Sequence, residues 1–456
     1  MKRFVLICLI LCSWFNAQAE DVELIACDNS LEMVDWGLEF IKHAEHSIEF
    51  SPCFFGGYLF QDYMLAIEEQ MIKHRKLQVH LFLSPLFLEP MNRDLLQRLQ
   101  KRFPRQLHIA YTVTDLQFTS KDMVTTDNHI NMLVVDELYF TTGGTNFDDA
   151  LVCEGTKPRV GRQKQCAMGA HLASGARDQD VVGRSKVIAT GLRTIFYQCF
   201  ALWKEYNNQA SFSNKDPASY KTNRYKLIND EQSIFVKKFE TSPDLITLDC
   251  SHIEIVLGSP HQKSNAIKEK YIEEIDKAQS SIVIGNLHFA PVDSIMDALQ
   301  RAAKRGVKIT IITNGIHDRS PASNSMISWP NRVAYLPLLF GRNFCSWQKK
   351  QCESVVLNQV DFYEYYVDNI LYHKKVMVVD DKTFVIGSYN LALRSDLCDY
   401  ELNLIIHSKQ VAKKALTILE RDQRHSIKIK HEQIKDWYFD PLVQYKAAIQ
   451  LSLIHI

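Results

Sequence analysis

The sequence predicts an α/β protein made of two similar halves. Apolar, β-branched runs alternate with stretches of helical periodicity, which is the spacing of parallel strands joined by crossover helices. One pattern of residues also occurs twice, beginning at His129 and again 244 residues later at His373. A chain of 456 residues is long enough for two domains with large cores.

The elements of the first half, residues 20–206, are expected in the order of a βαβ unit. Strands are expected at 22–26, 47–51 and 78–83, with helices at 31–44 and 59–73. In the second half, residues 249–456, strands are expected at 253–258, 281–286 and 307–313, with helices at 265–278 and 294–305. The polar, weakly periodic segment 207–248 is the expected linker, and 155–176 and 318–349 are expected to be long surface loops.

The N-terminus has the pattern of a secretory signal peptide. Lys2 and Arg3 precede the apolar run 4–12, and Ala17–Ala19 offers a small-x-small cleavage site. We therefore expect residues 1–19 to be removed and the mature protein to be exported, to the periplasm or the medium. An uncleaved membrane anchor is the alternative.

Charge and cysteine content narrow the function classes. The formal net charge is zero and the pI is about 7.2, so no global basic field indicates nucleic-acid binding. Nine cysteines follow residue 19, and the nearest candidate disulfides join Cys345 to Cys352 or Cys153 to Cys166. Cysteine and histidine spacings match no metal site, so we expect no metal and no cofactor.

The repeated pattern places a histidine, an acid and an asparagine at matched spacing. In each copy the histidine precedes an aspartate by 7 residues and an asparagine by 17. The first copy contains His129, Asn131, Asp136 and Asn146; the second contains His373, Lys375, Asp380, Ser388 and Asn390.

Each motif lies at an apolar strand, where residues i and i+2 share a face. His373 and Lys375 should therefore project together, as should His129 and Asn131. An extended strand carries Asp136 and Asp380 up to roughly 23 Å from their histidines. We therefore expect both aspartates to be structural residues that bind a turn. A hairpin could return Ser388 and Asn390 beside the histidine.

This set of side chains suits a phosphate group. The lysine neutralises charge, the amide and hydroxyl donate hydrogen bonds, and the histidine supplies a nucleophile or a proton. Two such half-sites facing each other would make a two-histidine phosphodiesterase. One histidine would attack phosphorus and the other would protonate the leaving alcohol.

The motifs resemble those of the phospholipase D superfamily, H-x-K-x-x-x-x-D followed by a glycine-rich G-S/G-x-N. The repeat extends the resemblance over nearly the whole mature chain. Downstream, Asp178 to Asp180 followed by Ser185 parallels Asp399 to Glu401 followed by Ser408. The resemblance implies two pseudo-repeated α/β halves packed face to face, mixed sheets flanked by helices, and an active site at their seam.

The family also implies roles for individual residues. His129, His373 and Lys375 would be catalytic, and Asn131, Asn146, Ser388 and Asn390 would bind phosphate or support the site. An acid in the position of Glu401 supports an active-site histidine, and Asp180 is its expected counterpart. The histidine of the first motif is usually the nucleophile, which implies a phosphohistidine at His129 with His373 as the acid. Because the intact motif surrounds His373, the roles could be exchanged.

Asn131 stands where the second motif has Lys375. It keeps a hydrogen-bond donor but loses a positive charge that would be worth several kcal/mol in a buried site. Replacing Asn131 with lysine is therefore expected to raise activity, unless another cation such as Lys121 substitutes.

Three function classes remain open on the sequence alone. The first is a phosphodiesterase or phosphatidyltransferase that acts on phospholipid headgroups, with a lipid or membrane surface as its partner. The second is a secreted nuclease on the same scaffold, which the neutral charge disfavours. The third is a phosphate-binding pseudoenzyme, which Asn131 favours. Two half-sites in one chain favour a monomer. The apolar segment 318–349 could form a lipid-facing wall, or it could pack onto its own domain.

Overall fold

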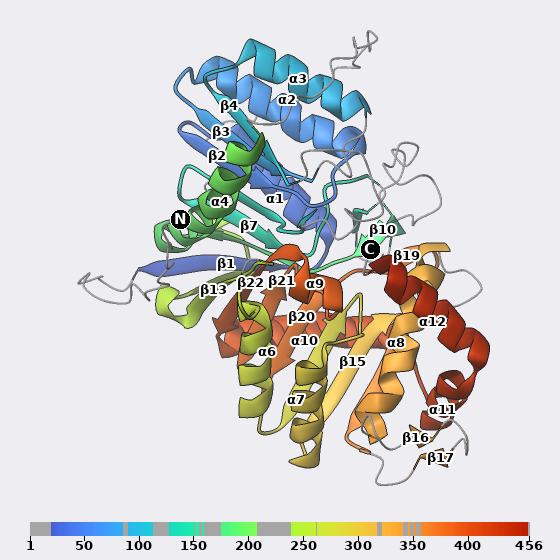
Figure 1. Cartoon of the computed structure of the whole chain (residues 1–456). Coiled ribbons are helices and arrows are strands. Elements are labelled where there is room, and N and C mark those ends of the chain that lie inside the picture. The colour runs from blue at the N-terminus through green and yellow to red at the C-terminus, as the bar shows by residue number, and fades with distance from the viewer. Residues whose placement is uncertain are drawn as a thin grey trace, which may run out of the picture.

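The computed structural model describes residues 20–84, 90–112, 127–149, 151–154, 157–158, 175–207, 239–260, 262–316, 322–340, 345–346, 351–352 and 357–454. Within these residues the chain forms two large mixed sheets with helices on both faces (Figure 1). The predicted fold class, two α/β halves flanked by helices, is confirmed.

The first half is built on an eight-stranded sheet of order β12-β1-β11-β7-β6-β2-β3-β4. Its strands are β1 (Asp21–Cys27), β2 (Ser47–Ser51), β3 (Gln78–Leu83), β4 (Leu107–Tyr111), β6 (Met132–Val135), β7 (Tyr139–Gly143), β11 (Asp180–Arg184) and β12 (Leu245–Asp249). Its helices are α1 (Ser30–Lys42), α2 (Gly57–Lys73), α3 (Pro90–Arg102) and α4 (Lys186–Asn207).

The second half repeats seven strands of this order: β1-β11-β7-β6-β2-β3-β4 corresponds to β13-β22-β21-β20-β14-β15-β18, and β23 pairs with β18 at the far edge. Its strands are β13 (Ile253–Gly258), β14 (Ser281–Asn286), β15 (Lys308–Asn314), β18 (Val360–Tyr365), β20 (Lys375–Val379), β21 (Thr383–Gly387), β22 (Asp399–His407) and β23 (Ser426–Lys428). Its helices are α6 (Ala266–Lys277), α7 (Asp293–Lys304), α8 (Ala322–Phe340), α9 (Leu393–Leu397), α10 (Lys409–Arg424), α11 (His431–Phe439) and α12 (Pro441–Ile454), and the short turn η2 (Cys250–His252) precedes β13.

Short strands complete the fold. They are β5 (Asp127–Asn128), β8 (Cys153–Glu154), β9 (Lys157–Pro158), β10 (Gly175–Arg177), β16 (Cys345–Ser346), β17 (Gln351–Cys352) and β19 (Ile370–Tyr372). The β16–β17 pairing sets Cys345 opposite Cys352, whereas Cys166, the expected partner of Cys153, lies outside the described residues.

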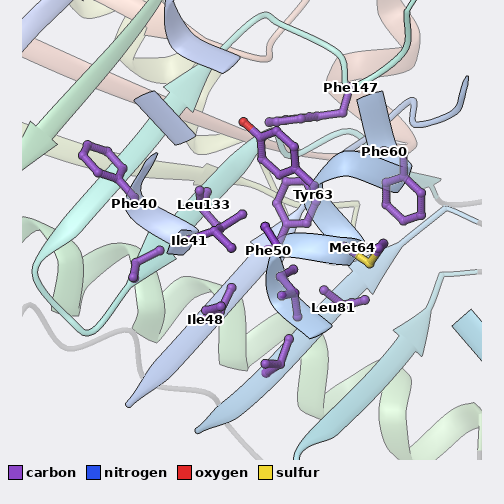
Figure 2. Close-up of a cluster of buried hydrophobic side chains, with 14 of the residues drawn as sticks. Phe40, Ile41, Ile48, Phe50, Phe60, Tyr63, Met64, Leu81, Leu133 and Phe147 are labelled. Carbon is purple, nitrogen blue, oxygen red and sulfur yellow. The ribbon is translucent and has the colours of Figure 1, made fainter. Parts of the chain in front are cut away.

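Among the described residues, three large hydrophobic cores follow from the layers, beside a small fourth cluster of Leu151, Ala176, Leu287 and Leu371. Helices α1 and α2 cover the outer face of the first sheet, where Phe50, Tyr63 and Phe147 pack ring against ring (Figure 2). Helices α6, α7 and α8 cover the outer face of the second sheet. Between the sheets, α4 and α10 belong to one cluster that draws residues from both halves. This shared inner core fixes the two half-sites relative to each other.

Sequence signals account for the element boundaries. Asn29 caps α1 by accepting a hydrogen bond from Glu32 N, and Ser408 caps α10 through Val411 N. The predicted strands 47–51, 78–83, 253–258 and 281–286 have the observed bounds. Valine, isoleucine, leucine and phenylalanine make up most of the interior positions of these strands.

Two segments differ from the sequence expectation. Most of the expected linker, 207–248, lies outside the described residues, but β12 at its end pairs with β1 and extends the first sheet. The expected loop 318–349 contains α8, and Tyr335, Leu336 and Leu339 on that helix are completely buried. The lipid-facing wall is therefore wrong for these residues; they pack onto the domain. The expected loop 155–176 lies mostly outside the described residues, as does the expected signal peptide, 1–19.

No helix among the described residues is both long and apolar enough to cross a membrane.

Candidate active site

Two short strand pairings join the halves and place both motif histidines at the seam. In the first pairing β5 lies parallel to β22, and His129 N donates to Tyr400 O at 3.0 Å. In the second, β10 lies parallel to β19, and His373 N donates to Arg177 O at 3.0 Å. Each histidine is therefore anchored to the backbone of the opposite half.

His129 is paired with a carboxylate from the other half. Its Nδ1 lies 3.1 Å from Glu401 Oε2, and the buried Cys53 thiol is a second hydrogen-bond partner of the ring. Glu401 also accepts a hydrogen bond from the Ser388 hydroxyl, which in turn accepts from Leu402 N at 3.0 Å. Ser388 thus holds the acid that orients His129.

His373 has the matching arrangement. Its Nδ1 lies 2.8 Å from Asp178 Oδ2 in the first half. Lys375 Nζ lies 2.7 and 3.0 Å from the two ring nitrogens and donates to His373 O at 2.8 Å. Asn146 Nδ2, also from the first half, is 3.5 Å from His373 Nε2. His373, Lys375 and Asn146 therefore share one location. The motif spacing predicted Ser388 and Asn390 beside His373, but Ser388 binds Glu401, the acid of His129, and the asparagine at His373 is Asn146 of the other half.

The acid that supports His373 is Asp178, so the assignment of Asp180 to this role was wrong. Asp180 accepts hydrogen bonds from Thr145 Oγ1 at 2.6 Å and Thr145 N at 3.0 Å. The sheet register explains the difference, since Gly143 pairs with Asp180 where Gly387 pairs with Asn403. Asp180 is therefore the equivalent of Asn403, and Asp178 is the equivalent of Glu401.

A signal for Asp178 was present in the sequence. Ser185 and Ser408 both begin helices and bond to the backbone N of the third residue on. They are 223 residues apart, and the same offset pairs Asp178 with Glu401. The sequence alignment that matched Asp178 with Asp399 and Asp180 with Glu401 does not keep this offset of 223 residues. Gly144 takes the place of Ser388, and a Cβ there would clash with Asp178.

Asn131 is tied into the protein by its own hydrogen bonds. Its Oδ1 accepts from Cys53 N at 2.8 Å, and its Nδ2 lies 3.3 Å from Asn146 Oδ1 and 3.4 Å from Gly144 O. Asn131 therefore holds Asn146 toward His373 and presents no unused donor to a phosphate. The site has been rebuilt around the asparagine. Lys121, the candidate substitute cation, lies outside the described residues.

The two histidines differ in charge preference. Burial disfavours a charged His129, but Cys53 and Glu401 outweigh burial and raise its pKa well above 6.5. Burial lowers the pKa of His373 below 6.5; Asp178 opposes this effect and the charge of Lys375 adds to it. These directions favour the protonated form at His129 and the neutral form at His373.

A third histidine belongs to the site and was missed from the sequence. Burial, together with repulsion from the protonated forms of Lys375, His373 and His129, lowers the pKa of His288 to about 3. His288 follows β14, the strand that pairs with the motif strand β20, and its N donates to Asn286 Oδ1 at 3.1 Å. It also lines a pocket of about 560 Å³ at the start of α7. The sequence signal that could have identified His288 is its position directly after a strand that pairs with the motif strand.

The motif aspartates lie away from both histidines. Asp136 accepts hydrogen bonds from the backbone N of Glu45, His46 and Ser47 at 2.7–2.9 Å. Asp380 accepts from the backbone N of Gln279, Ser280 and Ser281 at 2.7–2.9 Å. Each aspartate ties a hairpin turn to the start of a neighbouring strand.

The last motif residue, Asn390, is nearly buried. Its Oδ1 has no hydrogen-bond partner among the described residues, and its backbone N lies 3.3 Å from Ser395 Oγ. A buried amide oxygen of this kind is available to a ligand. Within the same residues, His, Cys, Asp and Glu side chains form no group of three that could hold a metal ion.

The known proteins that this chain resembles in sequence include cardiolipin synthases. Residues 271–423 match the family model described as "Cardiolipin synthase, PLD-like domain". Over 192 residues the chain is 27% identical to the cardiolipin synthase of Geobacillus sp. (strain WCH70), covering 42% of this chain and 34% of that protein. Over 181 residues it is 28% identical to the major cardiolipin synthase ClsA of Bacillus subtilis (strain 168), covering 40% and 33%.

A solved structure matches nearly the whole fold. The phosphatidylserine synthase of Haemophilus influenzae Rd KW20 superposes with a TM-score of 0.62 at 14% identity, covering 94% of this chain and 92% of that one. The repeated motif and the domain matched over residues 271–423 support membership of the phospholipase D superfamily, and the solved structure shows the same fold. The chain spans about a third of the length of the cardiolipin synthases that it matches.

Proposed function

We propose that the protein is a phospholipase D-type enzyme that cleaves or transfers phospholipid headgroups. The observation that carries the proposal is the composite site. Each histidine is held by an acid of the opposite half, at 3.1 Å for His129 and Glu401 and 2.8 Å for His373 and Asp178. A carboxylate on Nδ1 fixes the tautomer that leaves Nε2 for chemistry.

In the first step His373 is the nucleophile. Its neutral Nε2 attacks phosphorus, forming a P–N bond, and the P–O bond to the leaving alcohol breaks. Protonated His129 gives its proton to the leaving oxygen. This assignment exchanges the roles that are usual in the family, because Lys375 and burial keep His373 neutral while Glu401 favours the charged His129.

In the second step the acceptor hydroxyl, from water or from another alcohol, attacks the phosphohistidine. Its proton passes to neutral His129, a P–O bond forms and the P–N bond breaks. Lys375 supplies positive charge beside the reacting phosphate, and the Asn146 amide nitrogen lies beside the attacking Nε2 of His373. Water gives hydrolysis and a second alcohol gives headgroup transfer.

A phospholipid substrate is favoured over a nucleic acid by two observations. The relatives named above are cardiolipin and phosphatidylserine synthases, and the formal net charge of zero offers no polyanion-binding field.

A lipid assay tests the proposal. The chain without residues 1–19 is incubated with vesicles of phosphatidylglycerol, phosphatidylethanolamine or phosphatidylcholine, and headgroup release and lipid transfer products are measured beside single-stranded DNA digestion. We expect lipid turnover that is lost in His373→Gln. DNA digestion without lipid turnover would favour the nuclease, and anion binding without any turnover would favour the pseudoenzyme.

Export and a monomeric state are further parts of the proposal. The basic and apolar pattern at the N-terminus supports export, and N-terminal sequencing of the secreted protein should begin at Glu20. Both half-sites lie in one chain, so light scattering should give a mass near that of one copy. A first residue of Met1, or a site that works only in a dimer, would contradict these two points.

A further inference from the structure

Three charged side chains lie completely buried behind His373 and Asp178. They are Arg177, Lys374 and Asp422, with exposed fractions of 1%, 0% and 1%. Charged side chains are rarely buried to this extent unless they are paired. None of the three belongs to the motif set that explains the proposed chemistry.

Asp422, on α10, contacts both other residues through different oxygens. Its Oδ1 lies 2.8 Å from Arg177 Nε, and its Oδ2 lies 2.5 Å from Lys374 Nζ. Arg177 comes directly before Asp178 in the first half, and Lys374 comes directly after His373 in the second. One carboxylate therefore holds the chain neighbours of both members of the His373–Asp178 pair.

Further contacts fix the two cations in place. Arg177 Nη2 lies 3.0 Å from Asp28 Oδ1 in the first half, and Lys374 Nζ donates to Gln179 Oε1 at 3.2 Å. Burial lowers the pKa of Lys374 to about 8, with Asp422 opposing that effect. Because desolvation can cost as much as such an ion pair gains, stability alone is a weak reason for this arrangement.

The pseudo-symmetric positions in the other half are uncharged. The offset of 223 residues relates Arg177 to Tyr400 and Asp422 to Cys199, and the motif offset of 244 relates Lys374 to Ile130. Tyr400, Cys199 and Ile130 are buried in the inner hydrophobic cluster. Apolar packing therefore fills the equivalent positions behind His129. The buried cluster of Arg177, Lys374 and Asp422 is found only behind His373 in this comparison of the two half-sites.

We infer that Asp422 is a positioning residue for His373 and Asp178. By binding Arg177 and Lys374 together, it sets the relative position of two backbone segments from different halves, and so the hydrogen bond between Asp178 and His373 Nδ1. This role rests on the proposed phosphodiesterase function, in which His373 attacks phosphorus. A displacement of about 1 Å at a reacting group can cost on the order of 100-fold in rate.

Asp422→Asn tests the inference, with Glu364→Gln as a matched control. Glu364 forms another buried ion pair, with Arg332 at 2.6 Å, outside the active site. We expect Asp422→Asn to lower kcat about 10- to 100-fold with little change in KM. Glu364→Gln should lose stability while keeping kcat.

A second readout does not depend on turnover. His373 is faced by Asp178, Lys375, His129 and His288, and loss of the Asp178 contact removes the group that favours its protonated form. The NMR titration midpoint of His373, assigned with His373→Gln, should therefore move to lower pH in Asp422→Asn and stay in place in Glu364→Gln.

The two readouts separate the inference from the proposed function. A wild-type protein without turnover would end the proposed function, yet a moved His373 titration would still support Asp422 as a positioning residue. A folded Asp422→Asn with unchanged kcat and titration would overturn the inference. If Asp422→Asn does not fold, Asp422→Glu carries the same test. It keeps the charge but moves the carboxylate, and unchanged values would again overturn the role.

Discussion

At the scale of single residues, the two histidines are alike in geometry and unlike in charge. Each is held at Nδ1 by a buried acid, but His129 has Cys53 and Glu401 beside it and His373 has Lys375. In the proposed mechanism, this difference in neighbours makes His373 the nucleophile and His129 the acid. This is the usual way in which protein sites divide two similar groups between two tasks.

The division of tasks predicts a dependence on the leaving group. His129→Gln removes the acid, so cleavage of a natural phospholipid should fall about 1,000-fold, while a p-nitrophenyl phosphodiester should lose about 10-fold or less. His373→Gln should abolish both, because the nucleophile is lost. The check is kcat/KM for the two substrates in each variant. The reverse pattern would make His129 the nucleophile.

The pKa shifts predict a broad pH profile. Turnover needs neutral His373, so kcat/KM should fall as pH drops through a pKa below 6.5. It also needs protonated His129, so kcat/KM should fall as pH rises through a pKa well above 6.5. Glu401→Gln removes a contact that favours protonated His129, so the alkaline limb should move to lower pH. An unmoved alkaline limb would show that Glu401 does not control His129.

Asn131 now carries the opposite expectation from the one drawn from sequence. Asn131→Lys breaks the contacts to Cys53 N and Asn146 and adds a second buried cation near Lys375. We expect a loss of about 2 kcal/mol or more in the free energy of unfolding and lower kcat/KM. Denaturant unfolding and lipid turnover provide the check. A stable variant with higher activity would restore the view of Asn131 as a deficit.

The repeated spacing of the two motifs was enough to predict that the site contains His373, Lys375, Asn146 and Ser388. It could not show the contacts that Asn131 makes, because these depend on where Cys53 and Gly144 lie in three dimensions. It also could not assign charge to the histidines, since the pKa of a buried group depends on neighbours from the other half.

At the scale of elements, the turn aspartates stabilise the hairpins that carry the motif. Asp380 accepts three backbone hydrogen bonds and one from the Ser280 hydroxyl at 2.8 Å. Asp380→Ala should lower the free energy of unfolding by about 2–3 kcal/mol, since the backbone donors lose an ionised acceptor. Asp381→Ala is the control, because Asp381 is exposed and shares the left-handed backbone, with φ of 54° against 51°.

Urea unfolding of the two variants measures the difference. A loss in Asp380→Ala no larger than in Asp381→Ala would mean that the backbone conformation, and not the carboxylate, stabilises the turn.

Element prediction succeeded where one signal dominated. The strands flanking each helix were predicted because they are rich in β-branched and other apolar residues, and α1, α2, α6 and α7 because their periodicity is clear. Helix α8 was missed because Pro330 and Pro337 lie inside it and its apolar residues surround the helix rather than forming one stripe. When a helix is buried on most sides, its sequence does not alternate between apolar and polar residues with the period of a helix.

At the scale of the whole molecule, the active site exists only because two halves share one inner core. The internal repeat predicted two halves and a site between them. It did not give the exchange of acids, in which Glu401 serves His129 and Asp178 serves His373. That exchange follows from the parallel pairings β5–β22 and β10–β19, which connect residues 272 and 195 positions apart in the sequence. No local pattern encodes contacts of that range.

The most direct measurement of the central claim is the location of the covalent phosphoryl group. The enzyme is mixed with phospholipid vesicles and quenched in base, which preserves phosphohistidine, and its peptides are analysed by mass spectrometry. We expect the phosphatidyl group on His373, with more of it in Glu401→Gln because the second step needs a well-placed His129. A phosphatidyl group on His129 instead, or turnover without any histidine adduct in either protein, would contradict the account.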